Sequence, residues 1–390
     1  MTQPFELDDE EIVAMRRRAQ HAADVGRGPG WLTAARNGHV LDDEALITLL
    51  LAEDVPTAAL MDLARARRVD GPPQIETFSP LYVTNDCDAE CLMCGMRRQN
   101  DDLVRETADA ATVEGQLDIL RSRGLRGVAV LTGEYRLGPK RDAMIQKANH
   151  TLRAALDRGF RHVLINIGAL DQLEYDVLLD GVPRDADGRI VPHVTMCTFQ
   201  ETYARPAYAR FMGSTPENPR SDYQRRLANF DRAAAAGMRS CNPGVLLGLN
   251  DDVGFEMLAL LAHIRHLRTR DLTVYVSLPR LRRASGTAYA AGISDDLLCR
   301  VVAVLSFGCP DGKVVISTRE PPAMQRQLVP IIAVLTPGSP GVAPYSAADA
   351  RFELEASQFE VLDHRPIEAI LGEFLAAGTT IDCYEPAARS

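Results

Sequence analysis

Three cysteines that lie close together offer the most specific chemistry in this chain. Cys87, Cys91 and Cys94 stand in the run NDCDAECLMCG, with the spacing C-x3-C-x2-C. Thiolates this close in one loop can bind a single iron–sulfur cluster. A cubane [4Fe-4S] cluster held by three cysteines has one iron without a protein ligand. We therefore expect a cluster whose open iron can bind a small molecule through an amino and a carboxylate group.

Other assignments of the triplet are weaker but stay open, namely a zinc site and redox-active cysteines. A structural zinc site usually takes four ligands, paired as C-x2-C or C-x2-H. No histidine lies near the triplet in the sequence, and a disulfide framework is disfavoured in so large a chain. The other cysteines are isolated, and we expect them to be buried small hydrophobes: Cys197, Cys241, Cys299, Cys309 and Cys383.

Composition is typical of an intracellular enzyme. The chain has 390 residues, of which 46% are hydrophobic and 25% charged, enough for one large core with appendages. The formal net charge of -10 argues against a nucleic-acid-binding surface. The acidic N-terminus does not resemble a signal peptide, and the apolar runs are too short to span a bilayer. We expect a cytoplasmic protein, with neither nucleic acid nor membrane as a partner.

The pattern of elements predicts an α/β fold. Residues 1–75 read as a helical N-terminal extension, with helices over 41–51 and 57–68 and a break at 70–73. Short apolar runs then alternate with helical patterns such as 221–236 and 253–267, as in buried parallel strands. The runs are 81–84, 127–131, 162–166, 194–199, 242–248, 273–277, 313–317 and 331–335. Eight such units predict a complete (βα)8 TIM-type barrel over 76–342, with a C-terminal segment, 343–390, packed on it.

Polar residues follow the ends of most predicted strands, where the active sites of such barrels lie. If the small molecule at the open iron is an amino-acid-like sulfonium cofactor, its ammonium group needs a carboxylate. Its ribose needs hydroxyl or amide groups. Glu134 and Glu201 are the acidic candidates, and Gln200 and Asn166 the candidates for hydrogen bonds. Gly133 allows close backbone approach, although it can equally be a turn glycine.

Two arginines after later strands are candidates for a carboxylate clamp. Arg280 and Arg319 can each hold a carboxylate through two hydrogen bonds. Either can instead form a structural ion pair with an acid at the barrel mouth.

The motifs together carry a family resemblance. The cysteine triplet, LTGE (131–134), FQETY (199–203), SLPR (277–280), STRE (317–320) and SQF (357–359) resemble the radical S-adenosylmethionine aromatic amino acid lyases. Within this family the chain is most similar to the tryptophan lyases of thiopeptide biosynthesis, the 3-methyl-2-indolic acid synthases. The motifs shared with that branch are VTMC (194–197), RFMG (210–213), NPGVL (242–246) and PGSP (337–340). The resemblance runs from the first strand to the end of the chain, and residues 1–75 match only loosely.

The resemblance implies roles for individual residues at the cofactor end. The three cysteines would hold the [4Fe-4S] cluster, and Glu134 would bind the amino group of S-adenosylmethionine. Gln200 and Glu201 would lie on the cofactor side, with Arg210 as a further candidate.

At the substrate end the resemblance assigns three residues. Arg319 would hold the substrate carboxylate, and Tyr82 would line the substrate pocket. Thr336 stands where the tryptophan enzyme has serine. Arg283 departs from the proline of relatives, which leaves the loop after the sixth strand uncertain.

The implied reaction begins when an outside protein of the flavodoxin or ferredoxin type reduces the cluster, which cleaves S-adenosylmethionine to a 5'-deoxyadenosyl radical. The radical takes hydrogen from the amino group of an aromatic amino acid, and a carbon–carbon bond then breaks. The tryptophan branch makes 3-methylindole-2-carboxylate for antibiotic biosynthesis, and we expect that reaction here.

Other functions remain as alternatives. A tyrosine lyase, which forms p-cresol and dehydroglycine, or an enzyme with another indolic substrate would share the core. The hydrogenase-maturation type of tyrosine lyase has a cysteine-rich tail, whereas this tail holds only Cys383. A non-catalytic iron–sulfur carrier would lack the cofactor-binding motifs.

Overall fold

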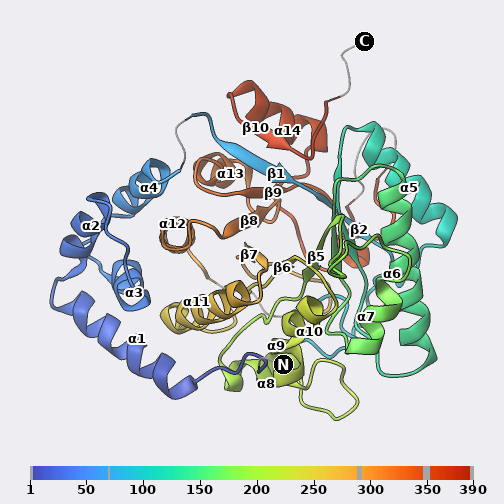
Figure 1. Ribbon diagram of the computed structural model, residues 1–390, viewed down its shortest axis with the longest axis horizontal. Coiled ribbons are helices and arrows are strands. Elements are labelled where there is room, and N and C mark those ends of the chain that lie inside the picture. The colour runs from blue at the N-terminus through green and yellow to red at the C-terminus, as the bar shows by residue number, and fades with distance from the viewer. Residues whose placement is uncertain (1–2, 69–70, 288–291, 346–351, 387–390) are drawn as a thin grey trace.

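A parallel β-sheet surrounded by helices forms the centre of the molecule (Figure 1). The computed structural model describes residues 3–68, 71–287, 292–345 and 352–386. The strands are β1 (Gln74–Thr77), β2 (Ser79–Tyr82), β3 (Gly127–Leu131), β4 (His162–Asn166), β5 (His193–Cys197), β6 (Ser240–Asn242), β7 (Thr273–Ser277), β8 (Lys313–Ser317), β9 (Val334–Thr336) and β10 (Thr380–Asp382). Their order in the sheet is β10-β1-β9-β8-β7-β6-β5-β4-β3-β2, and every neighbouring pair is parallel.

The α/β class is confirmed, but a complete eight-stranded barrel is not. The first expected strand, 81–84, corresponds to β2, which begins two residues earlier, and β1 before it was not expected. β1 pairs with β9 and β10, whereas β2 pairs with β3, and Phe78 separates the two. Among the described residues, β2 meets the chain after β9 through one isolated bridge, Tyr82 to Val342. The sheet is therefore a ten-stranded parallel sheet of half-barrel type.

Helices alternate with the strands along the chain. Those before the sheet are α1 (Asp9–Asp24), α2 (Gly28–Arg36), α3 (Asp43–Leu51) and α4 (Thr57–Ala66). The others are α5 (Ala110–Ser122), α6 (Pro139–Asp157), α7 (Gln172–Leu178), α8 (Arg205–Met212), α9 (Tyr223–Leu227), α10 (Asn229–Ala235), α11 (Val253–Thr269), α12 (Asp295–Gly308), α13 (Pro322–Leu328) and α14 (Ile367–Ala376), with a short 3-10 helix at Leu354–Ala356. No helix in the described ranges is long and apolar enough to cross a membrane.

Strand positions follow the buried apolar runs closely where those runs are clean. The runs 127–131, 162–166, 273–277 and 313–317 coincide with β3, β4, β7 and β8. The run 242–248 does not, because β6 ends at Asn242, directly before Pro243, and the chain continues only as isolated bridges. β10 was not expected, since its three residues TID carry no apolar run.

The helices before β1 pack on the outside of the sheet's own helices. α1 and α3 lie against α11, and α4 lies against α12 (Figure 1). Arg300 of α12 donates hydrogen bonds to the backbone carbonyls of Leu49, Ala52 and Val55 at distances of 2.6–2.8 Å. Carbonyls at a helix C-terminus lack intrahelical partners, so this arginine fixes the end of α3 to the sheet's helical layer.

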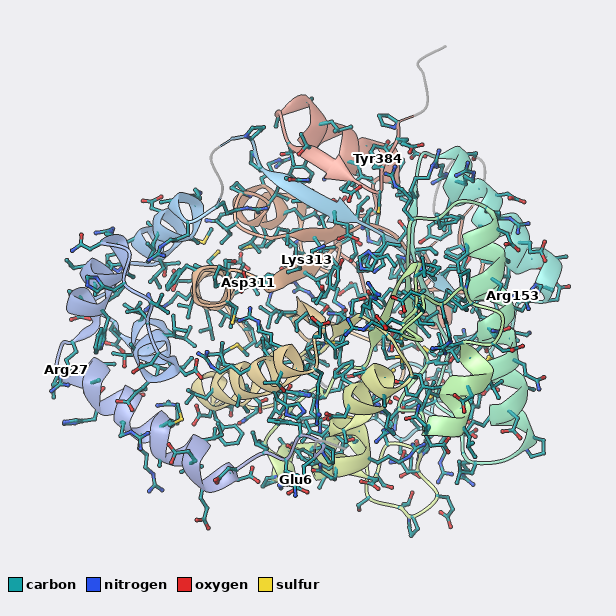
Figure 2. The ribbon with its side chains drawn as sticks, viewed as in Figure 1. Glu6, Arg27, Arg153, Asp311, Lys313 and Tyr384 are labelled. Carbon is teal, nitrogen blue, oxygen red and sulfur yellow. The ribbon has the colours of Figure 1, made fainter. Side chains whose placement is uncertain are left out.

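A buried polar network closes the amino ends of the strands. Lys313, the first residue of β8 (Figure 2), donates to Glu76 at 3.0 Å, and Tyr275 donates to the same carboxylate at 2.9 Å. His162 contacts Glu76 through Nδ1 and Thr195 through Nε2, the latter at 2.7 Å. The network satisfies buried polar groups of the strands within the protein.

The N-terminal segment is fixed to α11 through a buried histidine. Phe5 stacks on the His263 ring with 4.4 Å between ring centres, and the Tyr203 hydroxyl lies 2.8 Å from His263 Nδ1. Burial lowers the pKa of His263 to about 3. The folded protein therefore keeps this ring neutral well below the pKa of an exposed histidine.

This depressed pKa predicts a pH-dependent stability. Below about pH 6.5 the unfolded chain binds a proton at His263 that the folded chain excludes, so the free energy of unfolding should fall as pH drops toward 3, by about 1.4 kcal/mol per pH unit. Denaturant unfolding of wild type and His263→Gln between pH 7 and 4.5 measures this slope. The variant should lose that part of the slope, whereas the exposed His21→Gln should keep it; equal slopes for wild type and His263→Gln would refute the assignment.

Candidate active site

A cavity at the carboxyl ends of the strands brings most of the predicted site residues together. It is lined by Cys87, Cys91, Cys94, Tyr82, Gly133, Glu134, Asn166, Glu201, Arg319 and Thr336, among others. Gln200, Arg210 and Arg280 do not line it. Predicted site residues separated by up to 254 positions in the chain (Tyr82 and Thr336) thus meet at one place.

The cysteine loop lies between β2 and α5 and is docked on the end of β3. The Glu134 backbone N–H donates to Cys87 Sγ at 3.3 Å, and the Asp88 N–H donates to the Glu134 carbonyl at 2.9 Å. A Cβ atom at Gly133 would lie 2.0 Å from the Asp86 carbonyl oxygen. Glycine is required there because backbone meets backbone.

Each of the three thiols accepts a hydrogen bond. Arg220 Nη1 lies 3.1 Å from Cys91 Sγ, and Gln358 Nε2 lies 3.5 Å from Cys94 Sγ. Burial raises the pKa of Cys91 to about 11 and raises the pKa of Cys87 and Cys94 above the usual thiol value. Three free thiols that lie together, one buried and two partly buried, each face a polar hydrogen. This arrangement suits thiolates bound to a metal cluster, whose sulfurs accept such bonds.

Arg220 is the centre of a buried charge cluster that the sequence did not reveal. Its Nη2 lies 2.8 Å from Glu201 Oε1 and its Nε lies 3.2 Å from Glu134 Oε1, while Arg226 donates to the same Glu134 oxygen at 2.6 Å. Burial lowers the pKa of Arg220, but Cys91 and the two carboxylates raise it well above the usual value. Burial likewise raises, and Arg226 and Arg220 lower, the pKa of Glu134, which ends below its usual range. Arg220 and Glu134 therefore stay charged around neutral pH.

Glu201 holds a strained backbone conformation within this cluster. Its φ angle is 70°, in the left-handed region that non-glycine residues rarely adopt. The Leu246 N–H donates to the Glu201 carbonyl at 2.9 Å, and the Glu201 N–H donates to the Gly244 carbonyl at 3.3 Å. Such strain persists only where surrounding structure enforces it, and it is frequent at ligand-binding sites.

The other side of the cavity holds a half-buried arginine without an acid. Arg319 lies over the Phe359 ring, with Cζ 3.3 Å from the ring centre. Burial lowers its pKa to about 10, and among the described residues no carboxylate pairs with it. Tyr82 donates its hydroxyl hydrogen to Gln358 Oε1 at 2.6 Å, and Thr336 donates to the Ile316 carbonyl at 3.3 Å. This side can therefore accept an anionic group next to aromatic and hydroxyl side chains.

The three remaining candidates lie elsewhere. Arg280 is buried in an ion-pair network with Glu320 and Asp295, at 2.6 Å from the latter, which is the structural alternative considered for it. Arg210 is exposed on α8 and lies over Phe211, with its Cζ 5.1 Å from the ring centre. Gln200 is buried beside Glu201, off the cavity lining, and its Nε2 has no hydrogen-bond partner among the described atoms.

The sequence did not identify Arg220 because it lies in the loop between α8 and α9, many residues along the chain from any strand end. Position after a strand was the signal used, and that signal selects loops of β-to-α type only. The chain offers no local motif that separates Arg220 from the exposed Arg210 ten residues earlier.

Comparison with known proteins gives relatives over almost the whole chain. No family model matches. The chain is 27% identical over 381 residues to the 2-iminoacetate synthase of Escherichia coli K12, covering 95% of this chain and 92% of that protein. It is 26% identical over 383 residues to the 2-iminoacetate synthase of Salmonella typhimurium, with 96% and 92% covered.

Solved structures with a similar fold also match this chain over most of its length. A crystal structure of HydG, a maturase of the [FeFe]-hydrogenase, matches with a TM-score of 0.80 and 27% identity, covering 96% of this chain and 80% of that one. HydG from Carboxydothermus hydrogenoformans matches with a TM-score of 0.80 and 24% identity, covering 96% and 85%. Methylornithine synthase (PylB) shares the fold, with a TM-score of 0.67 and 17% identity over 92% and 97%.

The similarities bear on the family and do not extend to the tryptophan branch. They support the radical S-adenosylmethionine aromatic amino acid lyase family that the motifs indicate. They give no support to the tryptophan branch in particular.

Proposed function

We propose that this protein is a radical S-adenosylmethionine lyase that breaks a carbon–carbon bond of an aromatic amino acid. The observation that carries the proposal is a single cavity with two chemically different sides. One side holds three thiols and the acids Glu134 and Glu201, and the other holds the unpaired cation Arg319. A cofactor that generates a radical and a substrate that receives it can therefore lie next to each other.

The thiol side fits the cofactors in its donor set. Cys87, Cys91 and Cys94 would hold a [4Fe-4S] cluster, and Glu134 and Glu201 would bind the ammonium group of S-adenosylmethionine. Arg220 offers a cation for the cofactor's carboxylate, and Asn166, at the end of β4, offers an amide for ribose hydroxyls. When bound and reduced by an external flavodoxin- or ferredoxin-type protein, this pair supplies a 5'-deoxyadenosyl radical.

The opposite side fits an aromatic amino acid. Arg319 would bind the substrate carboxylate through two hydrogen bonds, which fixes the amino group relative to the cofactor side. Tyr82 and Thr336 line the same side, and the apolar residues Phe78, Leu164 and Val315 line the interior of the cavity. The protein's part is orientation and exclusion of water, because a carbon-centred radical reacts with whatever is near.

The relatives favour tyrosine as the substrate. 2-Iminoacetate contains one nitrogen, one α-carbon and a carboxylate, so forming it from an amino acid removes the whole side chain by Cα–Cβ cleavage. Applied to this chain, the reaction on tyrosine gives 2-iminoacetate and p-cresol. Tryptophan is the second candidate, since the VTMC and PGSP motifs, at 194–197 and 337–340, resemble the tryptophan branch.

Anaerobic reconstitution tests both candidates. The protein is loaded with iron and sulfide, then incubated with dithionite, S-adenosylmethionine and tyrosine, tryptophan or no amino acid. We expect 5'-deoxyadenosine in amounts that depend on the amino acid, with p-cresol from tyrosine. 3-Methylindole-2-carboxylate from tryptophan would favour the second candidate, and a cluster that never yields 5'-deoxyadenosine would identify an iron–sulfur carrier.

Arg319→Ala should retain the cluster and bind S-adenosylmethionine but lose substrate orientation. Loss of a charge-assisted hydrogen-bonded pair predicts a fall in kcat/KM of about 10- to 100-fold. Steady-state kinetics with the accepted amino acid measures this fall. Arg283→Ala, at an exposed arginine in the loop after β7, is the matched control and should behave as wild type. An unchanged product yield in Arg319→Ala would exclude the role.

Cys91→Ala should lose most of its iron after reconstitution, because a cluster cannot be held by the two remaining thiolates. Cys197→Ala is the matched control, since Cys197 is also buried and also lines the cavity but is not a predicted ligand. Iron and sulfide analysis with the visible absorption of the cluster separates the two. Equal iron in both variants would disprove the cysteine assignment.

A further inference from the structure

Residues 357–359 connect the two sides of the cavity. Gln358 contacts both Cys94 and Tyr82, and Phe359 lies against Arg319. The cofactor side and the substrate side are thus joined through consecutive residues of the C-terminal segment.

The backbone of this segment is fixed to the cysteine loop. Gly95 N–H donates to the Gln358 carbonyl at 3.0 Å, and Gln358 N–H donates to the Pro340 carbonyl at 3.3 Å. A Cβ atom at Gly95 would lie 2.9 Å from the Ser357 carbonyl oxygen, so the two segments touch backbone to backbone. The Gln358 side chain consequently has little freedom to move away from its partners.

The Gln358 amide can satisfy both neighbours in one orientation only. As a cluster ligand Cys94 would be a thiolate, which accepts and cannot donate, so the amide NH2 then faces Cys94, 3.5 Å away. The amide oxygen then faces Tyr82, whose hydroxyl must donate, at 2.6 Å. The ionised sulfur therefore fixes the direction of the hydrogen on the tyrosine, a group on the substrate side.

We propose that Gln358 is a positioning residue that couples the Cys94 cluster ligand to Tyr82; this rests on the proposed function. Its N–H stabilises negative charge on the sulfur, and hydrogen bonds to cluster sulfurs raise the reduction potential. Its carbonyl oxygen holds the Tyr82 hydroxyl in one orientation toward the amino acid. One side chain thereby sets both how readily the cluster is reduced and how the substrate is bound.

Three variants separate the two contacts. Gln358→Leu removes both, Gln358→Glu keeps an acceptor for Tyr82 but offers Cys94 no hydrogen, and Tyr82→Phe removes the hydroxyl alone. Gln99→Leu, at an exposed glutamine of the cysteine loop, is the control. Iron content is measured first, then the midpoint potential of the cluster by a redox titration followed by electron paramagnetic resonance, then KM and kcat for the amino acid.

The potential should move to more negative values in Gln358→Leu and Gln358→Glu and stay at the wild-type value in Tyr82→Phe and Gln99→Leu. KM should rise at least threefold in Gln358→Leu and Tyr82→Phe and stay within twofold of wild type in Gln358→Glu. The double variant Tyr82→Phe/Gln358→Leu should have the KM of either single variant, because both remove the same hydrogen bond.

A wild-type potential in iron-loaded Gln358→Glu, or a KM in the double variant equal to the product of the two single effects, would overturn the coupling. If Gln358→Leu loads less iron than wild type, the coupling is judged from the midpoint potential of Gln358→Glu, which keeps the size of the side chain. Because the potential is measured without substrate, failure of this inference is distinct from failure of the proposed function, in which wild type forms no cluster or yields no 5'-deoxyadenosine.

Discussion

The close approach of the cysteine loop to the end of β3 is the constraint on which the site depends. The Asp86 carbonyl oxygen occupies space that any side chain at position 133 would need, since a Cβ there would lie only 2.0 Å away. This contact lets the Glu134 N–H reach Cys87 Sγ and places the Glu134 carboxylate beside the thiols. A loop that carries three cysteines but is not docked would have no defined relation to the strand ends. The contact with β3 therefore fixes the position of the three cysteines relative to the strand ends.

Charge balance explains how acids and thiols can be buried side by side. Glu134 and Glu201 would repel each other and any thiolate, and burying carboxylates without a cation is costly. Arg220 lies between both acids and Cys91, and Arg226 adds a second cation at Glu134. Removing one member of such a buried set costs more than any single pair contributes, because the others are left uncompensated. The cofactor side is therefore built as one electrostatic unit, and Arg220 is its least replaceable member.

The sequence predicted the parts of the fold and site that depend on local patterns. Buried runs located β3, β4, β7 and β8, and the rule that sites follow strand ends selected Glu134, Glu201 and Arg319. Failures came where tertiary contacts decide. β1 was not predicted, because the separation of β1 from β2 at Phe78 depends on which neighbours each strand finds, and no local pattern encodes that.

The role of Arg220 could not be predicted for the same reason. Its function follows from what surrounds it in space, while its own loop has no periodicity and follows no strand. Arg280 shows the converse, because its position after β7 satisfied the rule, yet Glu320 and Asp295 already satisfy its charge. Position selects candidates, and only the partners of each side chain distinguish a binding group from a structural one.

Arg319 and Arg280 illustrate how that distinction works physically. The acids around Arg280 raise its pKa despite burial, so its charge is already compensated within the protein. Burial lowers the pKa of Arg319 to about 10, and among the described residues it has an aromatic ring and a backbone carbonyl as neighbours rather than an acid. Its loss of hydration occurs when the protein folds, before any ligand arrives. A carboxylate that enters therefore gains a charge-assisted contact with a cation that is already partly desolvated and held against Phe359, which is the preorganisation that orients a substrate.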